Sequence, residues 1–180
     1  GKSDDTAPIQ AAIHTAGRFG AEIFLPAGIY RITKTLTIHT HKAHSVIVRG
    51  QGGSPYGGAK DARQTKTSTL LWDGAEGGTL WQSVGAFGSS WRDMNFDGNG
   101  KAGILFEATT IPGYGDMLNT MSHVHFFRAK VGIQMAKAGW EHSCSHYLFE
   151  FVTFGSLTTA FLIKNDQGVD YLFNYVFGLS

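Results

Sequence analysis

The chain has 180 residues, which suits one domain of ordinary size. Aromatic residues make up 13% and charged residues only 16%, so the chain has too many apolar side chains to be intrinsically disordered. No run of about 18 uncharged apolar residues is present, which excludes a membrane-spanning helix. The formal net charge of +1 gives no electrostatic reason to expect nucleic acid, so we expect neither nucleic acid nor a membrane as partner.

The first twenty residues carry a helical pattern. The candidates for its N-cap are Asp4, Asp5 and Thr6. An apolar stripe with the spacing of one helix face follows, formed by Ile9, Ala12, Ile13 and Ala16. Gly17 and Gly20 favour an end to the helix. We predict a short, one-faced helix over residues 5–17 that lies against a larger body.

From residue 22 onward the helical period disappears, and short strands separated by turns follow. The expected strands are 23–25, 29–32, 36–38, 46–48, 70–72 and 79–81. Residues 49–68 are rich in Gly, Lys, Ser and Thr and are predicted to form a loop that leaves the core.

An imperfect internal repeat occupies the second half of the chain. Similar strand-and-turn segments begin at Met94, Val124, Val152 and Val176, with spacings of 30, 28 and 24 residues. A drifting period of this size is typical of stacked repeats that cannot bury their apolar faces alone. The repeats lack a helical period, so we expect parallel strands about 4.8 Å apart in a solenoid. The alternative is a flat sandwich, but it favours two-residue hairpin turns such as Asn-Gly, and Asn99-Gly100 is the one Asn-Gly dipeptide in the sequence.

The opening of the chain is similar to that of a known family. The matching segments are Asp4-Asp5-Thr6, Ile9-Gln10-Ala11-Ala12-Ile13, Phe24-Leu25-Pro26-Ala27-Gly28-Ile29-Tyr30, Leu36-Thr37-Ile38 and Val46-Ile47-Val48-Arg49-Gly50-Gln51-Gly52. Residues 3–52 resemble the pectate-lyase-3-type right-handed parallel β-helices, a group that includes phage tailspike depolymerases, family 55 glucanases and rhamnogalacturonan-degrading enzymes. The resemblance implies an all-β, right-handed parallel β-helix whose first helix caps one end.

We expect a single β-helix domain over residues 1–180, with residues 1–20 as the helical cap and residues 21–180 as coils. The family's aspartate- and glycine-rich strand upstream of the helix is absent, and family enzymes are commonly longer. The sequence also ends inside a repeat, at Phe177-Gly178-Leu179-Ser180. We therefore expect the chain to be part of a longer β-helix, or to be capped by another chain.

Outward-facing columns of the solenoid supply the candidate site. If the repeated Val and Phe residues point inward, their neighbours point outward. One such column contains Asp93, His123, Phe151 and Tyr175, and a second contains Asn95, His125, Thr153 and Phe177, with Asp97 beside Phe127. The rung spacing of about 4.8 Å would bring Asp93 within hydrogen-bonding reach of His123. Rings can stack on sugar faces, and paired carboxyl groups can cleave glycosidic bonds.

Three carboxyl groups are the candidates for catalysis, namely Asp93, Asp97 and Glu150. The candidates for substrate binding are His123, His125, Asn95, Phe151 and Tyr175. Asp93 and Asp97 lie about 13 Å apart along one strand, which is too far for a working pair. The partner must come from another rung or loop, and Glu107, Asp116 and Glu150 are available. The competing explanation for these polar residues on the outer face is that they are simply solvated and have no functional role.

Metal and cofactor sites are not predicted. The clustered histidines are His39, His41 and His44, then His123 and His125, then His142 and His146 beside Glu141. None of these groups has the spacing of a known zinc motif. The chain also lacks a dinucleotide-binding glycine motif and a phosphate-binding loop.

We expect a carbohydrate-active β-helix protein that binds and cleaves a polysaccharide, as a glycoside hydrolase or a polysaccharide lyase, outside the cell or on a virion surface. The class rests on the family resemblance, and the site rests on the outward columns. The alternative is a non-catalytic structural or adhesion β-helix, such as a tailspike shaft, that forms a homotrimer through its aromatic face. That alternative predicts Phe151, Tyr175 and Phe177 at the subunit contact.

Overall fold

Helix α1 (Thr6–Phe19) covers one end of the molecule in the computed structural model, which describes residues 3–39, 45–54, 66–137, 144–164 and 170–179. Its stripe of Ile9, Ile13 and Ala16 is buried against the first coil, as predicted. Gly20 ends the helix in the left-handed region, with φ 65°, so α1 runs past Gly17. Within the described residues no helix is long and apolar enough to cross a membrane.

Parallel strands form the rest of the fold. They are β1 (Glu22–Leu25), β2 (Gly28–Ile32), β3 (Leu36–His39), β4 (Ile47–Gly50), β5 (Ser68–Trp72), β6 (Thr79–Val84), β7 (Ser90–Asp97), β8 (Ile104–Thr109), β9 (Asp116–Met117), β10 (Thr120–Met135), β11 (Cys144–Ser145), β12 (Tyr147–Ile163) and β13 (Tyr171–Leu179). Every ladder between these strands is parallel. The parallel ladders exclude the flat sandwich and confirm an all-β solenoid of about five turns.

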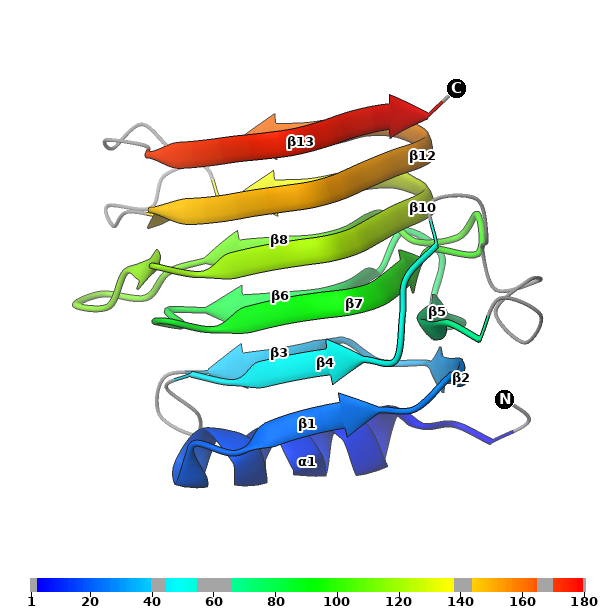
Figure 1. Cartoon of the computed structure of the whole chain (residues 1–180), viewed down its shortest axis with the longest axis horizontal. Coiled ribbons are helices and arrows are strands. Elements are labelled where there is room, and N and C mark those ends of the chain that lie inside the picture. Colours follow the sequence, from blue (N-terminus) through cyan, green and yellow to red (C-terminus); the bar gives the residue numbers. More distant parts are fainter. Residues whose placement is uncertain (1–2, 40–44, 55–65, 138–143, 165–169, 180) are drawn as a thin grey trace.

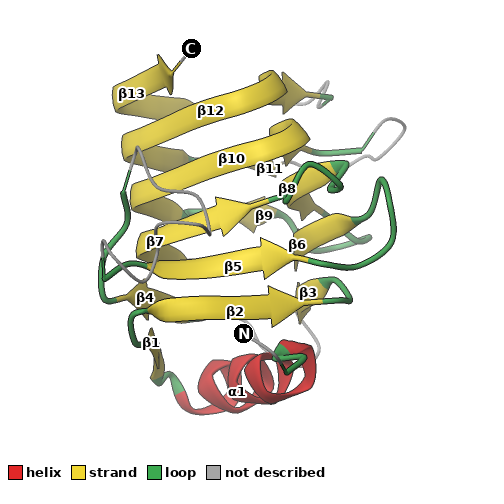
Figure 2. Ribbon diagram, turned by 90° about the vertical axis from the view of Figure 1, so that its right-hand side faces the viewer, coloured by secondary structure: helices red, strands yellow, loops and turns green. Residues whose placement is uncertain are grey.

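The solenoid is right-handed. In Figure 1 the front strands β1, β4 and β7 run from left to right, and the back strands β3, β6 and β8 run from right to left. Figure 2 shows β2 and β5 running from the front face to the back face on the side between them. The chain climbs from α1 to β13 as it makes these turns (Figure 1), which is the right-handed sense. The later strands β10 and β12 are long enough to pass through the front, the side and the back of one coil.

Left-handed residues make the corners of the coils. In the fourth coil Leu118 and His123 stand five residues apart with φ of 58° and 52°. In the fifth coil His146 and Phe151 repeat that spacing with φ of 55° and 50°. Each such residue bends an extended chain, so four-residue straight segments alternate with corners and the side-chain alternation restarts after each bend.

A column of phenylalanine rings runs along the interior. Phe96 and Phe126 stack with ring centroids 5.1 Å apart and planes at 16°, and Phe126 and Phe154 stack at 5.4 Å and 15°. Val124 pairs with Met94, and both are fully buried. The alignment of the repeats predicted from the sequence is therefore confirmed.

Candidate functional site

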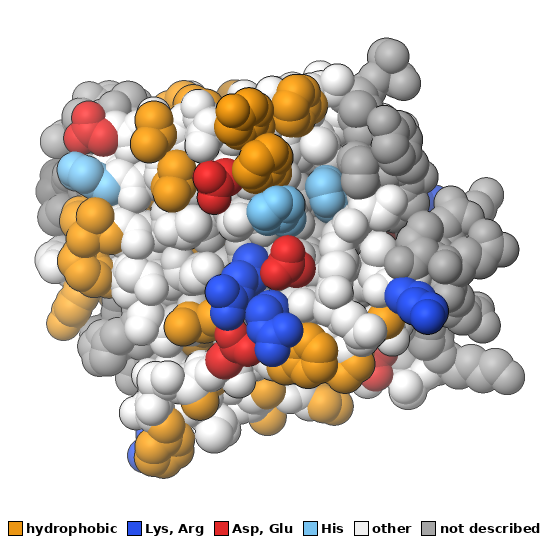
Figure 3. Space-filling model, viewed as in Figure 1, with side chains coloured by type: hydrophobic (Ala, Val, Ile, Leu, Met, Phe, Trp, Pro, Cys, Tyr) orange, Lys and Arg blue, Asp and Glu red, His pale blue; other side chains and the backbone are white. Residues whose placement is uncertain are grey.

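The predicted outward column of Asp93, His123, Phe151 and Tyr175 forms, and we call it the corner column because each member is a left-handed corner residue. Asp93 Oδ1 lies 3.9 Å from His123 Nδ1. The His123 and Phe151 rings stack at 4.8 Å and 13°, and the Phe151 and Tyr175 rings stack at 4.8 Å and 7°. The column crosses the face shown in Figure 3, where acidic, histidine and apolar side chains gather.

The stacking within the corner column determines how it can contact a ligand. Phe151 has one ring face against His123 and the other against Tyr175. A sugar therefore has no free face of Phe151 on which to stack, although the side chain is 38% exposed. Tyr175 keeps one face free of the column and is 59% exposed. The column presents ring edges along its length and ring faces only at its ends.

Two arginines adjoin the corner column on the front face. Glu22 accepts hydrogen bonds from Arg49 Nε at 2.8 Å and from Arg92 Nη2 at 2.6 Å, and these bonds hold the pKa of Glu22 below its usual value. Arg49 also lies over the Phe24 ring, 4.3 Å from its centroid. The blue and red side chains near the centre of Figure 3 lie in this region. Arg49 and Arg92 pair in register. Their 43-residue spacing lies outside the 24- to 30-residue repeat, so the sequence pattern did not predict this pair.

Glu150 lies on the same face as Asp93, higher in the solenoid. Ser122 pairs with Arg92 on one side and with Glu150 on the other, so Glu150 stands two rungs from the strand of Asp93. Two rungs correspond to about 10 Å between backbones. Asn174 Nδ2 donates a hydrogen bond to Glu150 Oε1 at 3.2 Å. The structure thus brings two of the three candidate carboxyl groups to one face.

The third candidate carboxyl group, that of Asp97, is fully buried. Arg128 Nε donates to its Oδ1 at 2.8 Å, and Arg128 Nη2 donates to its Oδ2 at 2.7 Å. The backbone N–H of Asn99 donates to the same Oδ1 at 2.9 Å. These bonds stabilise the turn after β7, and Asp97 does not reach the front face.

The second outward column is covered where Asn95 and His125 stand. Asn95 is fully buried and accepts a hydrogen bond from the Ser54 backbone N–H at 3.0 Å. His125 is 6% exposed, and its Nδ1 lies 2.6 Å from Thr153 Oγ1. Burial, helped by the charge of His123, lowers the pKa of His125 to about 4. Both residues point outward as predicted, but they contact neighbouring chain and are not presented to solvent.

The other two acids considered as partners are also enclosed. Glu107 accepts hydrogen bonds from Gln82 and Gln134 on neighbouring rungs, at 2.7 and 2.9 Å. Asp116 is fully buried, and its side chain accepts hydrogen bonds from Ser83, the Ala86 N–H, Asn119 and Tyr147. Burial outweighs these bonds and raises the pKa of Asp116 to about 6. Neither group belongs to the surface of the corner column.

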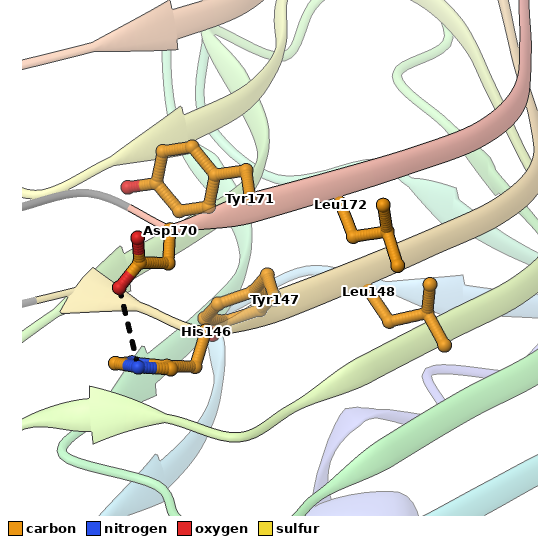
Figure 4. A pocket seen from close by; sticks show the side chains of 6 residues that line it. All are labelled: His146, Tyr147, Leu148, Asp170, Tyr171 and Leu172. Carbon is orange, nitrogen blue, oxygen red and sulfur yellow. Dashed lines mark ion pairs between the residues drawn. The ribbon is translucent and has the colours of Figure 1, made fainter.

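A surface pocket of about 400 Å³ lies at the start of β12 and β13 (Figure 4). Its lining consists of His146, Tyr147, Leu148, Asp170, Tyr171 and Leu172. His146 Nε2 lies 3.2 Å from Asp170 Oδ2, and Ser145 Oγ lies 2.8 Å from His146 Nδ1. Ser145, His146 and Asp170 are therefore linked, but Ser contacts Nδ1 and Asp contacts Nε2, which is the reverse of a hydrolytic triad. Ser145 is also 2% exposed, so it cannot reach a substrate.

Sequence reasoning missed this pocket, although a signal was present. The 24-residue spacing that relates Val152 to Val176 also relates His146 to Asp170. Applying that spacing to the polar residues would have placed these two side chains on adjacent rungs. Among the described residues no group of three His, Cys, Asp or Glu side chains is arranged to hold a metal ion.

Comparisons of the chain with protein-family models, with curated proteins and with solved structures found no match.

Proposed function

We propose that this β-solenoid binds a polysaccharide on its front face and hydrolyses it, with Asp93 and Glu150 as the two working carboxyl groups. The observation that carries the proposal is their placement on one exposed face, two rungs apart. Inverting glycoside hydrolases hold their carboxyl groups about 6.5–9.5 Å apart, and side chains on backbones about 10 Å apart can meet that spacing. The likeness of residues 3–52 to the pectate-lyase-3-type β-helices supports the same class of activity, and a polymeric substrate favours action outside the cell or on a virion surface.

The surrounding side chains fit this role. One carboxyl group would protonate the leaving oxygen while the other activates a water on the opposite face of the sugar. His123 Nδ1 lies 3.9 Å from Asp93 Oδ1, and its ring nitrogens can donate or accept hydrogen bonds with sugar hydroxyl groups. Arg92 is 44% exposed next to Asp93 and can donate hydrogen bonds to sugar hydroxyl groups.

The test is hydrolysis of a panel of plant, algal and bacterial polysaccharides by the wild type and by Asp93→Asn and Glu150→Gln. We expect each substitution to lower the release of reducing ends by about 100-fold or more, because each removes a proton-transfer group. Proton NMR of the first products should show the inverted anomer. Glu76→Gln, which changes an exposed carboxyl group on another loop, is the matched control and should keep full activity. Turnover that survives both site substitutions would refute the proposal, as would no turnover on the whole panel.

One observation favours a second candidate, a structural β-helix that forms a homotrimer through aromatic side chains. The rings of the corner column cover each other's faces, and Phe151, Tyr175 and Phe177 are all exposed. Exposed apolar edges of this kind are suited to burial between subunits. Sedimentation analysis on dilution decides the matter: a trimer that Tyr175→Glu dissociates supports it, and a monomer at all concentrations refutes it.

A further inference from the structure

We propose that the pocket at His146 and Asp170 is a second binding subsite, which takes one neutral sugar ring and holds the polymer along β12 and β13. This inference rests on the proposed function, because it concerns the same polysaccharide. It assigns the pocket a class of ligand, and it gives the direction in which the bound polysaccharide crosses the front face.

The pocket has a polar end and an apolar end. Figure 4 shows His146 and Asp170 facing each other at one end and Leu148 beside Leu172 at the other. Leu148 and Leu172 pair in register, and so do Tyr147 and Tyr171. The pocket therefore spans two rungs, and its wall changes from charged to apolar along the strand direction.

This division matches the two kinds of surface on a pyranose ring. A carboxylate can accept hydrogen bonds from two neighbouring hydroxyl groups, and an imidazole can donate or accept one more. Asp170 is 73% exposed and His146 is 51% exposed at the side chain, so both can reach a ligand. The two leucine side chains can cover the C–H groups of the ring. A volume of about 400 Å³ lies near the lower end of the range of about 300–1,000 Å³ for small-molecule sites.

The charges of the lining favour a neutral ligand. The lining holds no Lys or Arg, so nothing in it would neutralise a phosphate or a uronic acid. The one carboxylate already has His146 Nε2 3.2 Å from its Oδ2, which takes up one of its hydrogen-bonding positions. Sugar hydroxyl groups both donate and accept hydrogen bonds, so an uncharged ligand can satisfy the side chains of both His146 and Asp170.

The pocket and the proposed carboxyl pair lie along one strand. From His146 the outward positions of β12 pass through Leu148 to Glu150, a distance of four residues or about 13 Å. Phe151 of the corner column follows directly. Because the rings of that column cover each other's faces, they offer no stacking platform along the solenoid axis. A sugar chain that starts in the pocket and passes Glu150 would therefore run along the strands and cross the rungs only at their corners.

The test uses backbone amide NMR of the whole chain with neutral sugars as probes: glucose, galactose, mannose, and gluco- and manno-hexaoses. We expect at least one monosaccharide to shift the amides of His146, Leu148 and Leu172, and its hexaose to extend the shifts to Glu150 and Phe151. Asp170→Asn should weaken monosaccharide binding by about tenfold, the loss of one hydrogen bond to a charged group. Leu172→Ser, at a position 64% exposed, should also weaken it without disturbing the fold.

Asp93→Asn is the matched control, because it should leave binding in the pocket unchanged while removing hydrolysis. Sugar binding in the pocket without any hydrolysis would refute the proposed catalysis and keep the subsite. Hydrolysis with amide shifts confined to the surroundings of Asp93 and Glu150 would refute the subsite and keep the catalysis. Shifts at His146 with spermidine but with no sugar would also refute it, since the pocket would then select cations.

Discussion

Corner residues other than glycine set the geometry of the front face. Asp93, His123, Phe151 and Tyr175 all adopt φ between 50° and 58°, a conformation that costs an L-residue roughly 1–2 kcal/mol. Each ring contact in the column stabilises the folded state by about 0.5–1.5 kcal/mol. The column has four such residues but only two ring contacts, so stacking offsets only part of the conformational cost. The packing of the coils above and below must hold the rest of the column in place.

Ser156 allows the conformational cost to be measured alone. It is exposed with φ 54°, and its substitution by glycine should raise the free energy of unfolding by about 0.5–1 kcal/mol. Phe151→Gly relieves the same strain but removes two ring contacts, so we expect it to destabilise the protein. Urea denaturation of both variants gives the comparison, and a destabilised Ser156→Gly would show that the corners carry no strain.

Two buried titratable groups act on stability with opposite signs. The pKa of Asp116 rises from 3.8 to about 6 on folding. Its contribution to the free energy of unfolding is therefore complete below pH 3.8 and is lost as the pH rises through 6. The pKa of His125 falls from 6.5 to about 4, so its contribution is full above pH 6.5 and is lost as the pH falls through 4. Each effect amounts to about 3 kcal/mol at 1.36 kcal/mol per pH unit.

The two effects should nearly cancel in the wild type between pH 4 and 6.5. Asp116→Asn removes one of them, so its free energy of unfolding should rise by about 3 kcal/mol from pH 4 to 6.5. His125→Gln removes the other, and its stability should fall by a similar amount over the same range. Denaturation curves at pH 4, 5, 6 and 7 test both. Slopes that match the wild type would mean that neither buried group titrates in this range.

The phenylalanine column illustrates how strongly the strands depend on one another. Phe126 lies between Phe96 and Phe154 and is fully buried, so Phe126→Ala should cost about 3–5 kcal/mol through lost contacts and an internal cavity. Phe177→Ala is the matched control: the same change at a side chain 49% exposed should cost far less. Equal losses in chemical denaturation would mean that the ring stack is not the main support of these rungs.

The positions of the strands could be predicted because alternation and the 30-, 28- and 24-residue spacings repeat along the chain. The corners could not, since His123 and Phe151 look like ordinary strand residues in a pattern of apolar and polar positions. The direction in which Asn95 and His125 point was predictable, whereas their burial was not. The cover of Asn95 comes from Ser54, which lies 41 residues earlier in the chain.

The candidate site was predicted only in part for a similar reason. Asp93 and Glu150 share a face because of the register and because the left-handed corner at Phe151 resets the alternation. Strict alternation from the inward Val152 would instead have turned Glu150 inward, so the repeat alone did not predict this placement. Asp97 was separated from them by its ion pair with Arg128, which lies 31 residues away and carries no sequence motif. Partners of this kind depend on how loops close around a coil, and local patterns do not encode them.

For the molecule as a whole, α1 protects the first coil from association with other chains. Ile13 is fully buried beneath the helix, and Ile13→Asp would place a charge there without a partner. We expect a loss of about 3–5 kcal/mol and exposure of strand edges that then self-associate. Light scattering and urea denaturation measure both effects. Ala11→Asp, on the exposed face of the same helix, should change neither, and if both variants stay monomeric the helix is not a protective cap.

The parallel register has a mechanical consequence. Hydrogen bonds between rungs point along the solenoid axis, so tension applied along that axis loads one ladder at a time, whereas tension applied across it loads many bonds in shear. Stretching the protein along the solenoid axis should therefore separate the rungs one after another. A force of the same size applied across the axis should leave them intact. A molecule built this way is anisotropic, compliant along one direction and stiff along the other two.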